Sequence, residues 1–340
     1  MIKLSIIIPI FNVERYIERC IKSVAAHQDI DVDLYEIILI NDGSTDNSLE
    51  IAKQVAENYN NISIITQKNT GLGGARNHGI KLAKGEYIWF IDSDDFIQKR
   101  SLNSILQKLS DEKLDVLAFD FSCTNEYGDI INWIDFKLNF NNRKLLNGPE
   151  FYELNYKESY IWLYIFKRSL FTNNHIAFKN RINMQDSELL PRIMFHVKTI
   201  AFLDKKIYYY VNREDSFINS NNIRTRLKYY KSIIKVSYFL KEFQETLSTN
   251  HIIIKSLSKK QREIHKMLFQ QYLYTNFDNE RLKELLELLK TSNLFPFKNF
   301  EEKNKLKKAV YIFLRPMINI NPIFFRNLYL KLRINTKKAN

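Results

Sequence analysis

Short apolar runs alternate with amphipathic segments over the first 120 residues. The runs predict buried strands, and the segments between them carry apolar residues at helical spacing. The predicted strands are 4–10, 36–40, 62–66, 87–91 and 114–121, and the helices are 14–26, one ending at Glu57, 73–83 and 101–109. Strands that alternate with helices of this length indicate right-handed βαβ units and a mostly parallel sheet.

The pattern changes after Ser122. An Asn-rich, aromatic stretch predicts loops or hairpins, and the chain beyond residue 222 carries only helical patterns. The predicted elements are loops at 125–147, a strand or short helix at 160–168, a helix at 186–196, a strand at 200–211, helices at 223–246, 258–274 and 280–291, and two more after residue 303. We therefore predict an α/β domain over residues 1–220 and an all-helical extension over residues 221–340.

The positive charge is concentrated at one end of the chain. The formal net charge is +13, and residues 303–340 contain ten Lys/Arg and no acidic residue, so this basic tail supplies +10. The remainder is close to neutral, which differs from a uniformly basic nucleic-acid binder, and no nucleic-acid partner is expected. The two cysteines, Cys20 and Cys123, lie far apart and form no metal-binding spacing or disulfide framework.

The chain shows no signal peptide and no apolar run long enough for a transmembrane helix, so we expect a cytoplasmic protein. Residues 305–314 and 324–332 mix Lys/Arg with Phe, Tyr, Leu and Ile. That composition is typical of an interfacial helix on an anionic membrane, which predicts peripheral binding to the inner face of the cell membrane. The alternatives are a docked helical pair with solvated charges and, less favoured, RNA binding.

Three carboxylates stand together in Asp92-Ser93-Asp94-Asp95, directly after the predicted strand 87–91. Like charges this close raise each other's pKa, and a hard divalent cation relieves the repulsion. Mg²⁺ and Mn²⁺ are held by one or two carboxylates together with water and substrate phosphate oxygens. The segment therefore predicts a metal-bridged diphosphate site, with a helix N-cap as the alternative.

Polar residues also follow the first two predicted strands, where ligands bind in parallel sheets. A carboxylate at such a strand end, as at Asp42, accepts hydrogen bonds from a base or a ribose, whereas Asp46 is better explained as a helix cap. A glycine-rich segment, residues 69–79, opens the third helix, and its backbone N–H groups and Arg76 suit a phosphate. A dinucleotide fingerprint is disfavoured because it should follow the first strand.

Four motifs occur in order along the chain: Ser-Ile-Ile-Ile-Pro-Ile-Phe-Asn at 5–12, Asn-Asp-Gly-Ser-Thr-Asp at 41–46, the glycine-rich segment 69–79, and Asp-Ser-Asp-Asp at 92–95. Together they resemble a family-2 inverting glycosyltransferase with the GT-A fold, of the bacterial surface-polysaccharide type. The resemblance is sharpest over residues 1–122 and weaker to about residue 220. It implies a Rossmann-like sheet with flanking helices, a nucleotide-diphosphate sugar donor, usually a UDP-sugar, and Mg²⁺ or Mn²⁺.

The resemblance also implies roles for individual residues. The donor and nucleotide would be bound by Pro9, Phe11, Glu14, Asp42, Gly74, Arg76, Asp92 and Ser93. Asp94 would ligate the metal, and Trp162 and Arg213 are possible diphosphate or acceptor contacts. The family's polar residue between Trp162 and Lys167 is missing here, which puts the contact made there in question.

The general base implied by the resemblance is Asp186, the second member of an acidic pair that opens a helix. Gln185 replaces the first acid of that pair, which is a departure from the family pattern. An aspartate at this place can take a proton from an attacking hydroxyl. An N-cap role for Asp186 is the alternative.

The predicted function is therefore metal-dependent, inverting transfer of a sugar to a hydroxyl of a glycan or lipid-linked oligosaccharide in surface-polysaccharide synthesis. Inversion would follow from a single displacement with no covalent intermediate. Three alternatives remain at this point: a nucleotide-sugar-binding protein without transferase activity, a nucleotidyltransferase, and a membrane- or RNA-binding adaptor that acts through the basic tail.

Overall fold

The computed structural model describes residues 1–26, 28–134, 136–213, 222–249, 251–300, 302 and 304–338. The chain divides into two compact units, residues 1–219 (the first unit) and 220–340 (the second unit). The predicted boundary between residues 220 and 221 falls within 214–221, outside the described residues.

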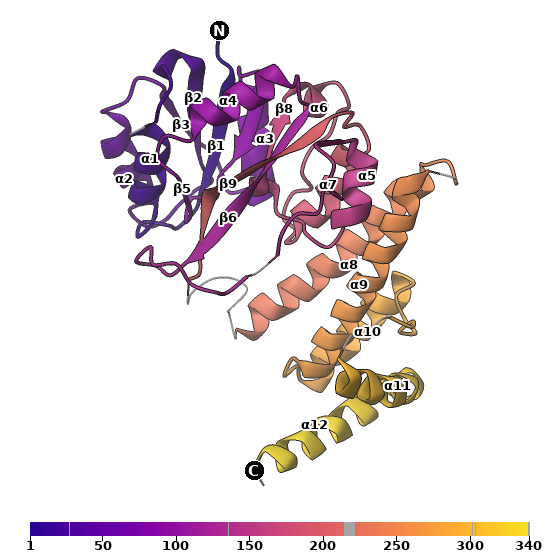
Figure 1. The fold of residues 1–340 in the computed structure, drawn as a ribbon. Helices are drawn as coiled ribbons and strands as arrows, with labels where there is room; N and C mark the ends of the chain where they lie inside the picture. The colour runs from indigo at the N-terminus through magenta and orange to yellow at the C-terminus, as the bar shows by residue number, and fades with distance from the viewer. Residues whose placement is uncertain are drawn as a thin grey trace. The chain divides into compact units, whose positions relative to one another are not determined.

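The first unit is built on one nine-stranded sheet (Figure 1). Its order is β3-β2-β1-β4-β8-β6-β9-β5, and β7 also pairs with β9. The strands are β1 (Leu4–Ile10), β2 (Tyr35–Asn41), β3 (Ile62–Thr66), β4 (Tyr87–Phe90), β5 (Phe96–Ile97), β6 (Val116–Thr124), β7 (Leu145–Leu146), β8 (Tyr164–Lys167) and β9 (Ile200–Val211). All the strands expected from the apolar runs are present, whereas the two-residue strands β5 and β7 were not predicted.

Half of the strand pairs in the sheet are parallel and half are antiparallel. Strands β3, β2, β1 and β4 pair in parallel, as the βαβ pattern predicts. Strand β8 inserts antiparallel between β4 and β6, and β5 and β7 both run antiparallel to β9. Strands β6 and β9 pair in parallel along Val116–Thr124, so the parallel expectation is confirmed there as well as in β3, β2, β1 and β4. It was wrong for β8, β5 and β7, and β8 joins the sheet without a crossover of the kind that fixes the direction of the earlier strands.

Strand β1 is the centre of the parallel half, and all seven of its residues are buried. Burial on both faces explains its unbroken apolar run, since helices cover both sides of parallel sheets. The helices of the first unit are α1 (Ile17–Ala25), α2 (Ser48–Ala56), α3 (Leu72–Leu82), α4 (Leu102–Asp111), α5 (Gly148–Asn155), α6 (Ser169–Thr172) and α7 (Gln185–Met194), with 3₁₀ turns η1 (Val32–Leu34) and η2 (Ile161–Leu163).

Helix α5 was missed although its start is readable in the sequence. Asn147 and Glu150 form a reciprocal capping box, and a proline occupies the first turn. Both are helix-start signals, but they lie at the end of an Asn-rich stretch that indicates loops. Helix α5 lies beside α7 (Figure 1), so it supports the helix that carries Asp186.

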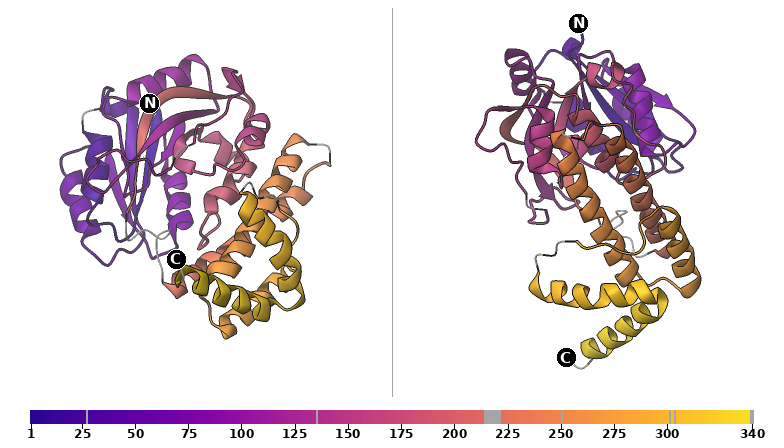
Figure 2. Two further views of the ribbon diagram at one scale, coloured as in Figure 1. Left: turned by 60° about the horizontal axis from the view of Figure 1, so that its bottom comes forward. Right: turned by 90° about the vertical axis from the view of Figure 1, so that its right-hand side faces the viewer.

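The second unit contains five helices in its described residues: α8 (Ile223–Glu245), α9 (Ile252–Tyr274), α10 (Asn279–Thr291), α11 (Lys305–Ile320) and α12 (Pro322–Lys338). Helices α8 and α9 run antiparallel side by side (Figures 1 and 2), linked by hydrogen bonds from Tyr230 Oη to the Leu268 carbonyl and from Ser237 Oγ to the Gln261 side chain. The helical extension is confirmed, and α9 begins six residues earlier than predicted, capped by His251. Among the described helices, none combines the length and the low polarity that spanning a bilayer requires.

Helix α3 approaches β1 closely at Gly79. A Cβ atom added to Gly79 would lie 2.4 Å from Ile7 Cγ2, and Ile7 is fully buried. Glycine in a helix interior normally costs about 1 kcal/mol relative to alanine, so its presence here reflects the packing of α3 on the sheet.

We predict that Gly79→Ala destabilises the protein by about 1–3 kcal/mol, because overpacking displaces a stiff, buried isoleucine. Urea denaturation of Gly79→Ala, Ile7→Ala and the double variant measures the coupling between the two positions. The double variant should lose less stability than the sum of the single variants, since Ile7→Ala removes the clashing methyl group. Additive losses would contradict the close approach.

Candidate active site

Arg76 joins two carboxylates that are far apart in the sequence. Its Nη2 lies 2.6 Å from Asp92 Oδ1 and its Nη1 lies 2.9 Å from Asp186 Oδ1. The Arg76 side chain is only 1% exposed. Helix α3, the end of β4 and helix α7 therefore meet at one buried guanidinium, which brings the predicted donor-side acid and the predicted base together.

The neighbour of Arg76 on α3 clamps the segment that leads to α7. The Asn77 side chain donates to the Phe178 carbonyl at 2.9 Å and accepts from the Phe178 N–H at 2.8 Å. The Phe178 ring in turn lies 5.2 Å from the guanidinium carbon of Arg76. Asn77 was not singled out from the sequence, although it belongs to the glycine-rich motif.

In this structure Arg76 binds two carboxylates, and its contact with a phosphate stays a prediction. Burial opposes the charge of Arg76, but Asp92 and Asp186 outweigh this effect and raise its pKa, so it stays charged. Both terminal nitrogens are committed to the two carboxylates. In this structure Arg76 therefore holds the two carboxylates in place.

Asp186 lies in the first turn of α7. Met184, two residues earlier in the sequence, adopts the left-handed backbone conformation with φ 58°. Its Oδ2 accepts a hydrogen bond from the Ile161 N–H at 3.2 Å, and no side-chain cap forms at the start of α7, so the N-cap alternative was wrong. Burial raises the pKa of Asp186, and the charge of Arg76 opposes that rise. A raised pKa makes an aspartate a better proton acceptor once it is ionised.

Gln185, the departure from the family pattern, is 4% exposed and packs against α3. A Cβ atom on Gly73 would lie 2.4 Å from Gln185 Oε1, so this glycine makes room for the side chain. No hydrogen-bond donor among the described residues reaches Oε1. An acid at this buried position would carry an unpaired charge, which a neutral amide avoids.

The three acids of residues 92–95 have separate partners. Asp94 Oδ2 lies 2.8 Å from Arg213 Nε, and both side chains remain about one-fifth exposed. Asp95 is buried and accepts from Tyr208 Oη at 2.6 Å and from the Val211 N–H at 2.8 Å. Burial, followed by the charges of Asp94 and Asp92, raises the pKa of Asp95 well above its usual value. Strand β5 follows this segment and α4 begins only at Leu102, so the helix-cap alternative was wrong.

A divalent cation at this site would need oxygen ligands from the substrate in addition to those from the protein. Among the described residues, no three His, Cys, Asp or Glu side chains form a cluster that would hold a metal on its own. Asp94 and Asp92 are both partly exposed and each is paired with an arginine, but the partner of Asp94, Arg213, is itself partly exposed, whereas the partner of Asp92, Arg76, is buried. Mg²⁺ needs only one or two protein carboxylates when phosphate oxygens and water complete its octahedron. The donor set therefore fits a cation held by Asp94 together with a diphosphate.

Asp42 holds the turn that precedes α3. Its Oδ1 accepts from Gln67 Nε2 at 2.7 Å and from the Thr70 N–H at 2.8 Å, and its Oδ2 accepts from the Gly71 N–H at 2.8 Å. Gly74 packs closely against the same turn, because a Cβ atom at Gly74 would lie 2.2 Å from Thr70 Oγ1. The contact of Asp42 with a base stays a prediction, and in this structure the side chain builds the turn.

The first and second motifs are tied together beside this turn. Glu14 Oε2 accepts from the Asn47 N–H at 2.9 Å, and Asp46 Oδ1 accepts from the Ser48 N–H at 3.0 Å. Asp46 therefore builds the turn before α2, as expected, but the N-cap position itself is Asn47, so the capping role was wrong. Phe11 follows β1 and is 48% exposed, so its ring is open to a ligand. Pro9 lies buried within β1, and Ser93 is 7% exposed.

Trp162 is a packing residue in this structure. It is 2% exposed, and its ring stacks on Tyr208 with a centroid distance of 4.3 Å. Its carbonyl accepts from Trp89 Nε1 of β4 at 2.9 Å. The diphosphate or acceptor contacts of Trp162 and Arg213 stay predictions, and in this structure Arg213 pairs with Asp94.

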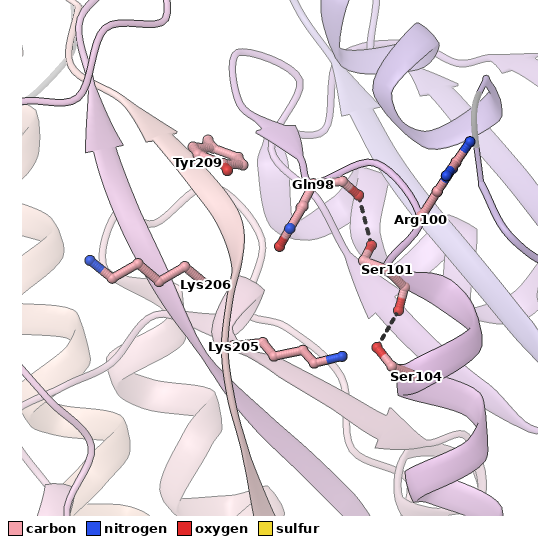
Figure 3. A pocket seen from close by; sticks show the side chains of 7 residues that line it. All are labelled: Gln98, Arg100, Ser101, Ser104, Lys205, Lys206 and Tyr209. Carbon is pink, nitrogen blue, oxygen red and sulfur yellow. Dashed lines mark hydrogen bonds between the residues drawn. The ribbon is translucent and has the colours of Figure 1, made fainter.

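A separate cavity of about 390 Å³ lies between α4, β5 and β9 and contains none of the predicted site residues. Figure 3 shows that its basic side chains diverge: Lys205 extends toward Ser104, whereas Lys206 and Arg100 point away. Diverging charges do not form an anion site, so the candidate active site remains the group around Arg76.

Comparison with known proteins identifies the family. Residues 5–172 match the model of glycosyl transferase family 2. The chain is 28% identical over 258 residues to the uncharacterized glycosyltransferase YibD of Escherichia coli, covering 74% of each chain. It is 33% identical over 219 residues to the uncharacterized glycosyltransferase EpsJ of Bacillus subtilis, covering 62% of each chain.

Solved structures share the fold. TarS residues 1–349 of S. aureus in complex with UDP-GlcNAc is 20% identical, with a TM-score of 0.64 over 86% of this chain and 80% of that chain. The mannosyltransferase PcManGT of Pyrobaculum calidifontis, in complex with GDP-Man and Mn²⁺, is 14% identical with a TM-score of 0.52, over 94% of this chain and 87% of that chain. At these identities the likeness concerns the GT-A fold, which is confirmed.

We predict that Arg76→Met lowers the free energy of unfolding at pH 7 by about 3–5 kcal/mol, because it leaves two carboxylates without their partner. Burial raises the pKa of Asp186 and Arg76 opposes that rise, so without Arg76 the deficit should shrink as the pH falls and Asp186 becomes protonated. Urea denaturation at pH 7 and pH 5 measures both effects. Arg181→Met, at an exposed position of the same region, is the matched control and should stay within about 0.5 kcal/mol. Equal stabilities of the two variants would contradict the bridging role.

Proposed function

Because the chain belongs to glycosyl transferase family 2, we propose that it moves a sugar from a nucleotide-diphosphate donor, a UDP-sugar, to a hydroxyl of a glycan or lipid-linked acceptor, with inversion. The observation that carries this proposal is the bridge of Arg76 between Asp92 and Asp186. One guanidinium holds the acid expected beside the donor and the acid expected to take the proton. Surface-polysaccharide synthesis is the role we propose for the reaction.

In the proposed mechanism Asp186 accepts the proton of the acceptor hydroxyl, and the resulting nucleophile attacks the anomeric carbon in a single displacement. The Ile161 N–H and Arg76 hold one oxygen each of the Asp186 carboxylate, which fixes its orientation. Arg213 lies beside Asp94 and can contribute positive charge to the departing diphosphate. Asp94 would hold Mg²⁺ or Mn²⁺, which when bound neutralises developing charge on that leaving group.

We propose that the first unit is the donor-binding and catalytic domain and the second unit a helical extension. The exposed ring of Phe11, the partly exposed Asp94 and the polar turn held by Asp42 all lie in the first unit, with Glu14, Gly74, Asp92 and Ser93. The TarS neighbour binds UDP-GlcNAc, which supports a uridine nucleotide as the first donor to test.

We propose that the second unit associates with a membrane, because it is basic and exposes an apolar helix face. Residues 220–340 contain 25 Lys/Arg against nine Asp/Glu, whereas residues 1–219 contain 26 against 29. Helix α11 exposes Leu306, Phe313, Met317 and Ile320, at 81%, 75%, 39% and 82%. Their spacing places them on one helix face. Lys305 and Lys307 flank that face, an arrangement suited to an anionic bilayer.

Donor use is the first test. Incubation with Mn²⁺ and a panel of UDP-, GDP-, CMP- and dTDP-sugars should release one nucleotide, with UDP expected. Asp94→Ala should abolish the metal-dependent release, and Asp186→Asn should retain donor binding while lowering transfer about 10²–10⁴-fold.

Asp204→Asn is the matched control for these two variants, because that carboxylate lies on β9 with its side chain 78% exposed. It should behave as the unaltered protein. Donor binding with no transfer by the unaltered protein would favour a nucleotide-sugar-binding protein, whereas pyrophosphate release from a nucleotide triphosphate and a sugar phosphate would favour a nucleotidyltransferase. Full transfer by Asp186→Asn would contradict the proposed base.

Membrane association is tested separately. The triple variant Leu306→Ser, Phe313→Ser, Ile320→Ser should weaken cosedimentation with phosphatidylglycerol vesicles by at least about tenfold, since each buried side chain contributes about 1.5–3 kcal/mol. Val32→Ser with Ile130→Ser is the control, because these residues are exposed to 53% and 70% in the first unit. Unchanged binding of the triple variant would contradict a membrane role for α11.

A further inference from the structure

Aromatic rings gather beside the two carboxylates that Arg76 holds. Trp162 stacks on Tyr208 with an interplanar angle of 12°, and Tyr210 stacks on Trp162 at 16°. Trp133 then stacks on Tyr210 at 15°, with a centroid distance of 5.5 Å. The four rings come from three segments of the chain and form one continuous group of nearly parallel faces.

A second pair extends this group. Phe136 stacks on Tyr160 at 11°, with a centroid distance of 5.3 Å, and Tyr160 contacts Trp162 at the same distance. Tyr208 and Trp162 are buried, whereas Trp133, Phe136, Tyr160 and Tyr210 are partly exposed. We call these four partly exposed rings the aromatic platform.

The platform is linked to both sides of the candidate active site. Tyr160 directly precedes Ile161, whose N–H donates to Asp186 Oδ2. Tyr208 accepts from the Asp92 N–H at 3.1 Å and donates to Asp95. Burial and the charges of Asp95, Asp94 and Asp92 raise the pKa of Tyr210, so its hydroxyl remains protonated. Because Tyr160 is next to the residue that holds Asp186, a molecule on the platform would lie close to the proposed base.

We propose that the aromatic platform binds the acceptor, and that the acceptor presents a pyranose ring beside its reactive hydroxyl. This inference rests on the proposed glycosyltransferase function. The axial C–H groups of a pyranose form an apolar, slightly positive face, which complements the negative face of an aromatic ring. The equatorial hydroxyls at the ring edge are left for polar partners such as Asp186.

The composition of the aromatic platform favours an acceptor with a pyranose ring over other classes of acceptor. A linear polyol phosphate has no flat C–H face and would be recognised by cations, but none of the four platform residues is basic. The donor diphosphate would be held near Asp94 and Arg213. The platform residue Tyr160 directly precedes Ile161, which holds Asp186, so an acceptor on the platform would have a hydroxyl within reach of the proposed base.

The test compares Trp133→Ala, Trp133→Phe and the control Tyr127→Ala, a 91% exposed aromatic residue of the same stretch. Transfer from the donor found in the panel would be measured with malto-, cello- and chito-oligosaccharides and with ribitol phosphate. Trp133→Ala should raise the acceptor KM about tenfold, and more than the donor KM, because one stacking face is lost. Trp133→Phe should restore most of the affinity, and Tyr127→Ala should match the unaltered protein.

Isothermal titration of the same oligosaccharides without donor is the second readout, because it does not depend on catalysis. Oligosaccharide binding that Trp133→Ala weakens would support the platform even if no donor were turned over, in which case only the proposed function would fail. An unchanged acceptor KM, an equal rise in donor KM, or a preference for ribitol phosphate over every pyranose would overturn the proposal.

Discussion

The candidate active site depends on the neutralisation of a buried charge. Arg76 is held inside the first unit between Asp92 and Asp186, and its buried charge is neutralised by these two carboxylates. The contact of Asn77 with Phe178 brings the chain before α7 to the same place. A charge requirement of this kind explains why a strand end, a glycine-rich turn and a later helix meet at one point.

The pattern of apolar and polar residues predicted strands β1 to β4 and the strand ends at which acidic residues lie. Apolar runs located β1 to β4, and strand-end chemistry pointed to Asp42 and Asp92. The pairing of Arg76 with Asp186 spans 110 residues, and no spacing rule reveals it. The antiparallel insertion of β8 is equally non-local. Trp162 and Asp95 belong to recognisable motifs, yet whether such a side chain faces a ligand or the core is decided by tertiary packing.

The two units differ in the chemistry they offer. The first unit has a small excess of acidic residues, so an anionic donor needs local positive charge, which Arg213 and a cation on Asp94 would supply. The second unit has a large excess of basic residues and an exposed apolar face on α11. The aromatic platform adds a third kind of surface, apolar and uncharged, beside Asp186. In our proposal these surfaces receive the donor, the membrane and the acceptor, respectively.

The most direct test of the central claim is a crystal structure of the protein with UDP and Mn²⁺. We predict that Arg76 keeps both ion pairs, to Asp92 and to Asp186, while the diphosphate lies next to Asp94 and Arg213. A structure in which Arg76 leaves Asp186 to bind the diphosphate would contradict the account, because the proposed base would then lose the residue that positions it.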